Sequence, residues 1–200
     1  MPGRSSESVA VPRADLQARR RARGPCPLIL AVVAALALTP VPASSEKSIN
    51  NTKAEMLLNL ARFVEWPSQR LRSGNQMTFA ILGDDDLAGV IAAEFSSKTI
   101  NGRDVFVRCV RRVEDVEDGH VLFIASSEAK RIPDILKALR SNGVLTVADV
   151  TGFAALGGMV EFVQQGEKVR FDVNLDSARQ AKLKMSAKLL ALATIVAHAP

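Results

Sequence analysis

The sequence predicts a single α/β domain with a mixed central β-sheet. The first observation is that short apolar segments of strand length alternate with segments of helical periodicity between residues 77 and 149, in the order β-α-β-β-α-β. The second is that residues 159–175 alternate apolar and polar side chains on both sides of a turn, as in a β-hairpin. The third is that amphipathic segments flank this region at both ends, with the spacing of helices that cover a sheet.

Residues 1–43 have the three-part layout of a secretory signal peptide. An Arg-rich start precedes the apolar run 28–38, which has 11 residues, whereas a helix that crosses a bilayer needs about 20. Val41 and Ala43 suit the two specificity positions of signal peptidase, so we expect cleavage after Ala43 and a periplasmic mature protein. An uncleaved N-terminal anchor is the alternative. A lipoprotein anchor is disfavoured, because Cys26 precedes the apolar run instead of following it.

The positive charge of the chain belongs mostly to this export signal. Residues 1–43 contain six Arg and two acidic residues, so the mature chain carries 20 basic and 19 acidic residues and a net charge of about +1. A nucleic-acid partner is therefore not expected. The mature chain of 157 residues is long enough for one domain with its own core. Its single cysteine, Cys109, is expected to be a small buried hydrophobe, with intermolecular pairing as the alternative.

The domain itself is expected over residues 51–198, after a polar leader at residues 44–50. Its first helix runs through "TKAEMLLNLARFVEW", with Asn51 or Thr52 as the N-cap. Pro67 then ends the helix, because proline disfavours a helical backbone in the residue before it. The core-facing stripe of this helix consists of Leu57, Leu60, Ala61 and Val64.

The central elements follow in order. A buried strand at residues 77–83 is followed by a helix at 84–98 and by a strand with one polar face at 103–113. Parallel strand pairing around crossover helices is favoured by this order. The later elements are a strand at residues 120–126, a helix at 128–140, a strand at 143–149 and a hairpin at 159–175 with its turn near Gln165–Gly166. A terminal helix at residues 176–198, capped by Asp176 or Ser177, completes the domain.

No pattern in the sequence predicts catalytic residues, a metal site or a cofactor. The acidic residues 84–86 could bind a hard cation, but acidic side chains at a helix start are more often caps. Ser126 and Ser127 lack a nucleophile elbow and a histidine base. The histidines of the mature chain, His120 and His198, do not have metal-binding spacing. We therefore expect a protein that is not an enzyme.

Polar residues follow three of the predicted strands at the points where those strands end. They are Asp84, Ser126 and Asp149. In open α/β sheets, ligands bind outside the carboxyl ends of the strands, so these residues are candidates for holding a small polar ligand. The alternative is that they are ordinary helix caps and turn residues.

Two groups of residues are candidates for contact with a protein partner. Arg62, Glu65 and Trp66 lie near the end of the first helix, and Arg170 and Asn174 lie on one face of a predicted strand. An ordinary solvated surface is the alternative for the polar residues. For Trp66, the only tryptophan, the alternative is a hydrophobic plug that closes the core.

Six segments, taken in order, resemble the YfiR family of small exported proteins. Together they extend from about residue 53 to residue 193, and they include Trp66–Pro67 and Gly157–Gly158. The segments are "KAEMLLNLARFVEWP", "FAILGDD", "GRDVFVRCVRRVED", "HVLFIASSE", "VLTVADVTGFAALGGMVEFV" and "VRFDVNLDSARQAKLKMSAKLLALA".

The resemblance implies an α/β fold and a periplasmic regulator without catalytic activity. The family's namesake represses an inner-membrane diguanylate cyclase through the periplasmic sensor region of that enzyme, and an outer-membrane lipoprotein relieves the repression. Cyclic-di-GMP and biofilm formation then respond to conditions in the envelope, and homodimers occur in the family. Redox control is not carried over, because this chain lacks the paired cysteines that some members have in the segments beginning at Ala80 and Gly119.

The sequence therefore predicts a non-catalytic periplasmic regulatory protein that controls a membrane signalling protein of the diguanylate cyclase type by protein–protein contact. The alternative is a periplasmic sensor module that holds a nucleotide or an amino acid at the strand ends. An enzyme of unknown type is the third hypothesis.

Overall fold

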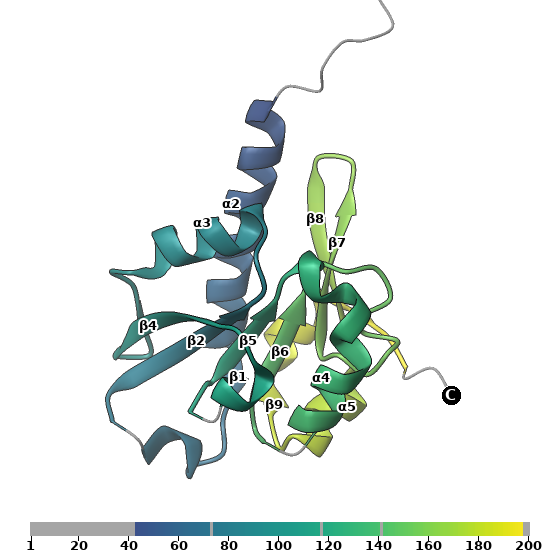
Figure 1. The fold of residues 1–200 in the computed structure, drawn as a ribbon. Helices are drawn as coiled ribbons and strands as arrows, with labels where there is room; N and C mark the ends of the chain where they lie inside the picture. The colour runs from purple at the N-terminus through teal and green to yellow at the C-terminus, as the bar shows by residue number, and fades with distance from the viewer. Residues whose placement is uncertain (1–42, 73, 117, 141, 198–200) are drawn as a thin grey trace, which may run out of the picture. The chain divides into compact units, whose positions relative to one another are not determined.

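The computed structural model describes residues 43–197 except 73, 117 and 141 (Figure 1). The described residues belong to one compact unit. The predicted signal peptide, apart from its last residue Ala43, lies outside the described residues, as does His198. Within the described part of the chain, no helix has the length and apolar character needed to cross a membrane.

A central β-sheet organises the fold. Among the described residues its strands lie in the order β10-β8-β7-β6-β5-β2-β4-β3 (Figure 1). Strands β4, β2, β5, β6 and β7 are mutually parallel, whereas β8 is antiparallel to β7 and β3 is antiparallel to β4. The bounds are β2 Gln76–Leu82, β3 Thr99–Ile100, β4 Arg103–Val110, β5 Val121–Ile124, β6 Leu145–Ala148, β7 Val160–Gln165, β8 Lys168–Val173 and β10 Thr194–Ile195. The predicted α/β class, mixed sheet and C-terminal hairpin are confirmed.

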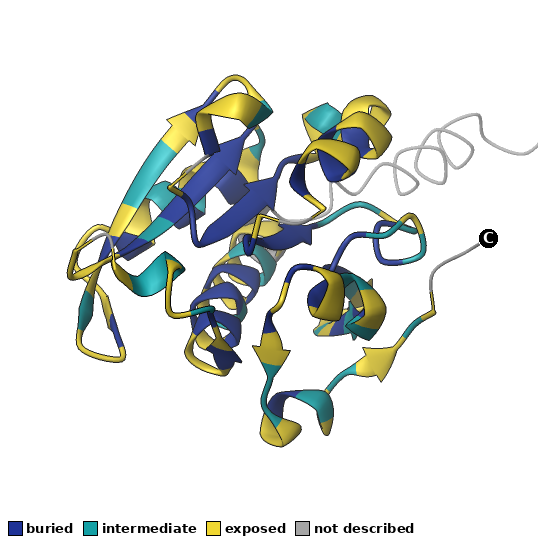
Figure 2. Ribbon diagram, turned by 90° about the horizontal axis from the view of Figure 1, so that it is seen from below, coloured by how far each residue is buried: buried dark blue, intermediate teal, exposed yellow. Residues whose placement is uncertain are grey.

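The sheet separates two hydrophobic clusters. Helices α2 (Ala43–Arg62) and α3 (Asp86–Phe95) pack on one face, where the rings of Phe79 and Phe95 meet edge to face with centroids 5.1 Å apart. Helix α4 (Ile132–Leu139) packs on the other face. Successive side chains of β2 point to opposite faces, so its apolar run supplies both clusters. Figure 2 shows the resulting burial, which is concentrated in the central strands and on the inner side of α2.

The first helix is longer at its start, and shorter at its end, than the sequence predicts. Helix α2 begins at Ala43, so the polar leader at 44–50 is helical and neither Asn51 nor Thr52 is an N-cap. The hydroxyl of Thr52 instead donates to the carbonyl oxygen of Ser48 one turn earlier, which satisfies it inside a helix. At its other end α2 stops at Arg62, because the next residues form strand β1 (Val64–Glu65), which pairs with β9 (Lys184–Met185).

The prediction of a continuous terminal helix over residues 176–198 is wrong. Two short helices, α5 (Leu175–Gln180) and α6 (Ala187–Leu190), replace it, with β9 between them and β10 after them. Helix α5 ends in a tight turn in which Lys182 has a positive φ of 60°. This turn directs the chain into antiparallel pairing with β1, and the tertiary pairing overrides the helical propensity of the segment.

The paired glycines before the hairpin have distinct structural roles. Gly157 has a φ of +102°, a conformation that side chains disfavour. Gly158 has an ordinary backbone, but a Cβ atom there would lie 2.2 Å from the buried ring of Phe153. The first glycine is therefore needed for backbone geometry and the second for space.

The prediction that Cys109 is buried is wrong, because the structure exposes it. Strand β3 pairs with β4 only at Arg103 and Asp104. The remainder of β4 therefore forms the edge of the sheet, and Cys109 lies near the end of that edge.

Candidate functional site

The carboxyl ends of β2, β5 and β6 meet at one edge of the sheet, since these strands are parallel. From β2 the chain first crosses to β4 on one side and then continues through β5 and β6 on the other. The strand order therefore reverses between β2 and β5, which is where open α/β folds commonly bind ligands. The predicted ligand residues Asp84, Ser126 and Asp149 all follow these three strands.

The loops after β2 and β5 are tied directly to one another at this reversal point. The carboxylate of Asp85 accepts hydrogen bonds from the backbone amide of Ser126 at 2.8 Å and from its hydroxyl at 3.2 Å, and it also caps α3 by accepting from the amide of Ala88. The amide of Asp84 donates to the hydroxyl of Ser127 at 3.0 Å. Protein groups thus occupy the crevice between the two loops.

A cavity of about 270 Å³ lies beside these loops. Two of the predicted ligand-binding residues, Ser126 and Asp149, line this cavity. Asp84 does not line it, whereas its neighbours Asp85 and Asp86 do. Asp149 is held by an ion pair with Lys53 of α2, whose ammonium lies 2.6 Å from the carboxylate and whose side chain is 5% exposed. The complete lining is Glu46, Ile49, Asn50, Asp85, Asp86, Leu87, Ser126, Asp149 and Gln164.

The chemistry of this strand-end cavity disfavours an anionic ligand. Four of its lining residues are acidic and none is basic, so a phosphate group would be repelled. Within the described ranges, His, Cys, Asp and Glu side chains form no group of three that could hold a metal ion. A neutral or cationic small molecule fits the cavity better than a nucleotide.

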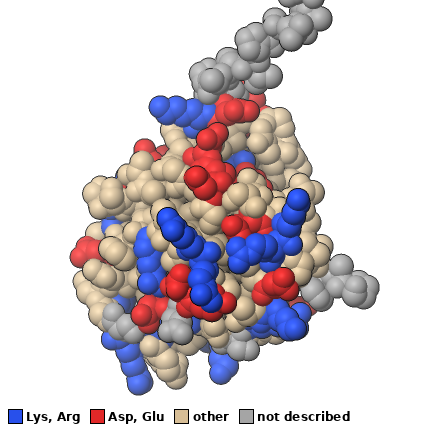
Figure 3. Space-filling view, viewed as in Figure 1, with Lys and Arg blue, Asp and Glu red and all other residues tan. Residues whose placement is uncertain are grey.

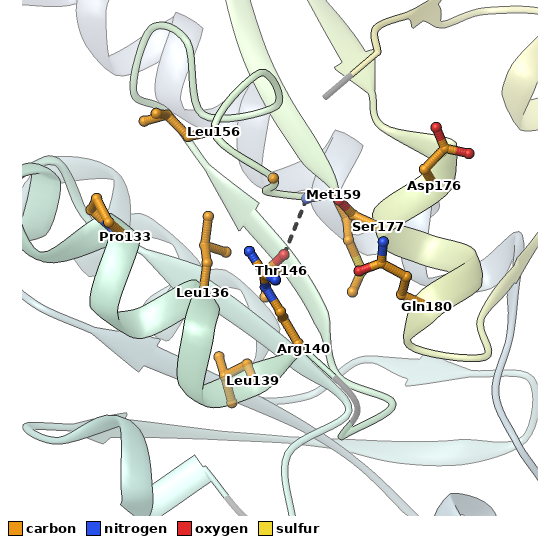
Figure 4. A pocket seen from close by; sticks show the side chains of 11 residues that line it. Pro133, Leu136, Leu139, Arg140, Thr146, Leu156, Met159, Asp176, Ser177 and Gln180 are labelled. Carbon is orange, nitrogen blue, oxygen red and sulfur yellow. Dashed lines mark hydrogen bonds between the residues drawn. The ribbon is translucent and has the colours of Figure 1, made fainter. Parts of the chain in front are cut away.

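A second cavity, of about 200 Å³, lies between α4 and α5 (Figure 4). Apolar side chains such as Leu136 and Met159 form its walls, and polar groups such as Arg140 and Gln180 lie around them. At its base Thr146 accepts a hydrogen bond from the amide of Met159 at 3.1 Å. The sequence does not predict this cavity, because four separate segments between residues 133 and 180 contribute to it and none of them carries a recognisable motif.

Two of the predicted partner-binding residues are buried and have structural roles. Asn174 is fully buried: its side chain accepts from the amide of Ser177 at the start of α5 and donates to the carbonyl oxygen of Ala154 at 2.8 Å. Trp66 is 8% exposed. The burial of these two residues favours roles inside the fold over the predicted partner contacts, and for Trp66 it favours the plug.

The remaining three predicted partner residues lie on the surface. Arg62 and Glu65 are exposed around the end of α2, and Arg170 is exposed on β8. The guanidinium of Arg62 donates to the side chain of Asn59 at 3.2 Å, and Glu65 is aligned with Lys184 in the β1–β9 pair. Phe63, which is 40% exposed, lies between Arg62 and Glu65 in the chain. A protein partner can reach all of these side chains.

His120 is a buried polar residue whose ring is fully engaged. Its Nδ1 accepts from the amide of Thr78 at 3.1 Å, and its Nε2 lies 3.1 Å from the carbonyl oxygen of Arg70. Burial lowers the pKa of His120 below its ordinary value, because the charged imidazolium loses hydration. The neutral imidazole therefore acts as a structural link between β2, β5 and the loop after Trp66.

The charged surface of the domain is mixed. On the face shown in Figure 3, Lys and Arg side chains are interspersed with Asp and Glu. This face therefore does not present the continuous basic surface typical of nucleic-acid binding.

Comparison with models of known protein families identifies the family of this chain. A model of the YfiR/HmsC-like family matches residues 50–194. The chain belongs to the YfiR/HmsC-like family. No curated protein matches this YfiR/HmsC-like chain.

Solved structures resemble this YfiR/HmsC-like protein in fold. A conserved domain protein from Vibrio cholerae O1 biovar eltor is 11% identical with a TM-score of 0.50, over 73% of this chain and 59% of the other. An ABC domain from Streptococcus pneumoniae, solved in complex with L-Trp, is 12% identical with a TM-score of 0.50, over 74% of this chain and 60% of the other. The YfiR/HmsC-like chain thus spans about three fifths of these structures, and the likeness shows a common α/β fold.

Proposed function

We propose that this protein is a non-catalytic periplasmic regulator that controls an inner-membrane signalling protein of the diguanylate cyclase type by protein–protein contact. The observation that carries the proposal is the family match, which covers nearly all of the described domain. The predicted export signal supports the periplasmic location. By analogy with the family's namesake, an outer-membrane lipoprotein is a second partner, and a homodimer is the form expected to act.

The end of α2 is the surface that we propose for contact with the membrane protein. An exposed aromatic ring, Phe63, lies between the exposed charges of Arg62 and Glu65. Aromatic and Arg side chains dominate the binding energy of many interfaces, and surrounding charges set specificity. Arg170 on β8 is proposed as a further contact.

Two experiments test the regulatory function. Deletion of the gene should change cellular cyclic-di-GMP, and the tagged mature protein should recover a membrane sensor protein in a pull-down. The charge reversals Arg62→Glu and Glu65→Lys should weaken recovery. Lys130→Glu, a reversal at an exposed residue in the 3-10 helix Ser126–Arg131, is the matched control. Unchanged cyclic-di-GMP together with an empty pull-down would refute the proposal.

A small-ligand sensor is the second candidate function, and the cavity between α4 and α5 favours it. Sites for small molecules combine apolar walls with convergent polar groups. This cavity has both, with Leu136 and Met159 on the apolar side and Arg140, Thr146 and Gln180 among its polar groups. A thermal-shift panel of metabolites, with L-Trp included because one structure of similar fold contains it, tests this function. A ligand present at 100 times its Kd should stabilise the protein by about 2.7 kcal/mol, and no shift with any compound would count against a sensor.

A further inference from the structure

One region of the sheet surface lies outside both hydrophobic clusters. On the face that carries α4, the cluster begins at Ala80 of β2 and Val110 of β4. The preceding residues on that face, Thr78 and its neighbour Phe106 on β4, are not part of it. A cavity of about 390 Å³ is found here, lined by Gln76, Thr78, Phe106, Arg108, Asp118 and His120.

Arg108 is the unusual residue of this cavity. Its Nε and Nη2 atoms are buried and have no hydrogen-bond partner. The guanidinium group is a planar, positively charged set of N–H donors without an acceptor atom. No ion pair among the described residues includes it. Arg108 as a whole is half-buried, but these two N–H groups are withdrawn from water without an acceptor. Buried polar groups are normally hydrogen-bonded, so this edge of the guanidinium lacks an acceptor.

The two unpartnered atoms define the shape of the missing group. Nε and Nη2 lie on the same edge of the guanidinium, and their N–H bonds point in the same direction. A carboxylate can accept both hydrogen bonds at once, one with each oxygen. The buried edge of Arg108 is therefore matched to a planar, bidentate acceptor.

The other lining residues narrow the ligand class. Both ring nitrogens of His120 are engaged with backbone groups, so Arg108 remains the cation of the cavity. Asp118 is the one acidic residue of the lining, and it would repel a doubly charged phosphate more than a singly charged carboxylate. Phe106, which is 49% exposed and two residues before Arg108 on the same face of β4, offers a flat apolar surface beside the guanidinium.

We propose that this cavity binds a small carboxylate with an apolar body. The carboxylate accepts hydrogen bonds from Nε and Nη2 of Arg108, and the apolar body lies on the ring of Phe106. The ligand is either a free organic acid or the C-terminal carboxylate of a peptide with an apolar last residue. The inference concerns a site separate from the proposed partner surface, and it does not depend on the regulatory function.

The test is a titration of the mature protein, starting at Ser44, followed by amide NMR signals of Thr78 and Phe106. Phenylacetate is the probe, and we expect saturable shifts with a Kd of about 1–10 mM, as for a fragment with one charged contact. Phenylacetamide, which lacks the charge, and inorganic phosphate should bind at least about tenfold more weakly. An acetylated dipeptide ending in Phe, compared with its amide, distinguishes a peptide terminus from a free acid.

Variants assign the binding to the cavity. Arg108→Met should weaken phenylacetate binding at least about tenfold, whereas Arg111→Met, at an exposed arginine just beyond β4, should leave it unchanged. Without ligand, Arg108→Met should melt at or above the temperature of the wild type, because it removes two buried N–H donors that have no acceptor. The proposal is overturned by the absence of saturable shifts, by equal affinity of the Arg108→Met variant, or by a marked fall in the Tm of that variant, which would show that Arg108 is satisfied within the fold.

Discussion

The indole Nε1 of Trp66 donates a hydrogen bond to the backbone oxygen of His120 at 3.1 Å, and the two rings meet edge to face with centroids 6.2 Å apart. The same oxygen also accepts from the amide of Leu145 at 2.8 Å. One carbonyl group thus joins the segment after α2 to the starts of β5 and β6. Trp66 closes the core where the first helix meets the sheet.

Replacement of Trp66 should therefore affect folding before it affects any partner. We expect Trp66→Ala to lower the free energy of unfolding by about 3–5 kcal/mol, since a large buried ring is lost. Trp66→Phe should cost about 1–2 kcal/mol, because the oxygen of His120 keeps its bond to Leu145. Urea unfolding of the mature protein measures both. Phe63→Ala, at a half-exposed ring, is the control and should cost less than about 1 kcal/mol; equal effects at the two positions would contradict the plug.

The ion pair between Lys53 and Asp149 should respond unequally to removal of its two partners. Lys53 is 5% exposed and Asp149 is 28% exposed. Asp149→Ala leaves a buried ammonium without its partner and should cost about 2–4 kcal/mol. Lys53→Met leaves a carboxylate that water can reach and should cost about 1–2 kcal/mol. Chemical denaturation measures the free energy of unfolding of both variants. A greater loss of stability for Lys53→Met than for Asp149→Ala would contradict the account that Lys53 is the more buried partner.

The close approach of the loops after β2 and β5 requires glycine at position 83. Gly83 has a φ of +89°, and a Cβ atom would lie 2.6 Å from the hydroxyl oxygen of Ser127. Gly83→Ala should cost about 2–4 kcal/mol, from backbone strain and from displacement of Ser127. Gly102 has a φ of +78° with no atom near its Cβ position, so Gly102→Ala measures the backbone cost alone, about 1 kcal/mol. Equal losses in thermal unfolding would mean that the loops can separate freely.

Stability should depend on pH through His120. Burial lowers its pKa in the folded state below the ordinary value of 6.5, so the unfolded chain binds the proton more readily. The free energy of unfolding contributed by this group is therefore complete above pH 6.5 and is lost as the pH falls toward the folded-state pKa. His120→Gln cannot titrate and should remove that part of the pH dependence. Unfolding curves at several pH values give the free energy of unfolding of the wild type and of the variant. If this free energy falls equally with pH below pH 6.5 in both proteins, His120 does not have this role.

The exposure of Cys109 predicts rapid reaction with a thiol reagent. Ellman's reagent should label the native mature protein in the absence of denaturant, because the edge of β4 is open. A serine variant at this position should give no signal. Labelling that appears only in denaturant would show that Cys109 is buried, as the sequence predicts.

The sequence predicts most of the sheet because its central strands are apolar on both faces. The run through Phe79 and Leu82 is buried on either side, and such a run has few other stable arrangements. The terminal segment differs, since its apolar spacing suits a helix equally well. Only the pairing of β9 with β1, two segments more than a hundred residues apart in the chain, determines that it breaks at Lys182.

The candidate sites were less predictable for a similar reason. Three consecutive aspartates follow β2, and loop geometry alone decides that Asp85, and not Asp84, bridges to Ser126 and faces the strand-end cavity. Asn174 ends a predicted strand in the same alternating pattern as Arg170, but it is buried because it caps α5. The unpaired edge of Arg108 has no signature in the sequence, because it depends on which groups lie nearby in three dimensions.

The central claim is that the exported protein regulates a membrane signalling enzyme. The most direct test is cellular cyclic-di-GMP in a deletion strain complemented either with the full chain or with a chain that starts at Ser44 behind an initiating Met. We predict that deletion raises cyclic-di-GMP, that the full chain restores the wild-type level, and that the unexported chain does not. An unchanged level in the deletion strain, or equal restoration by both chains, would contradict the claim.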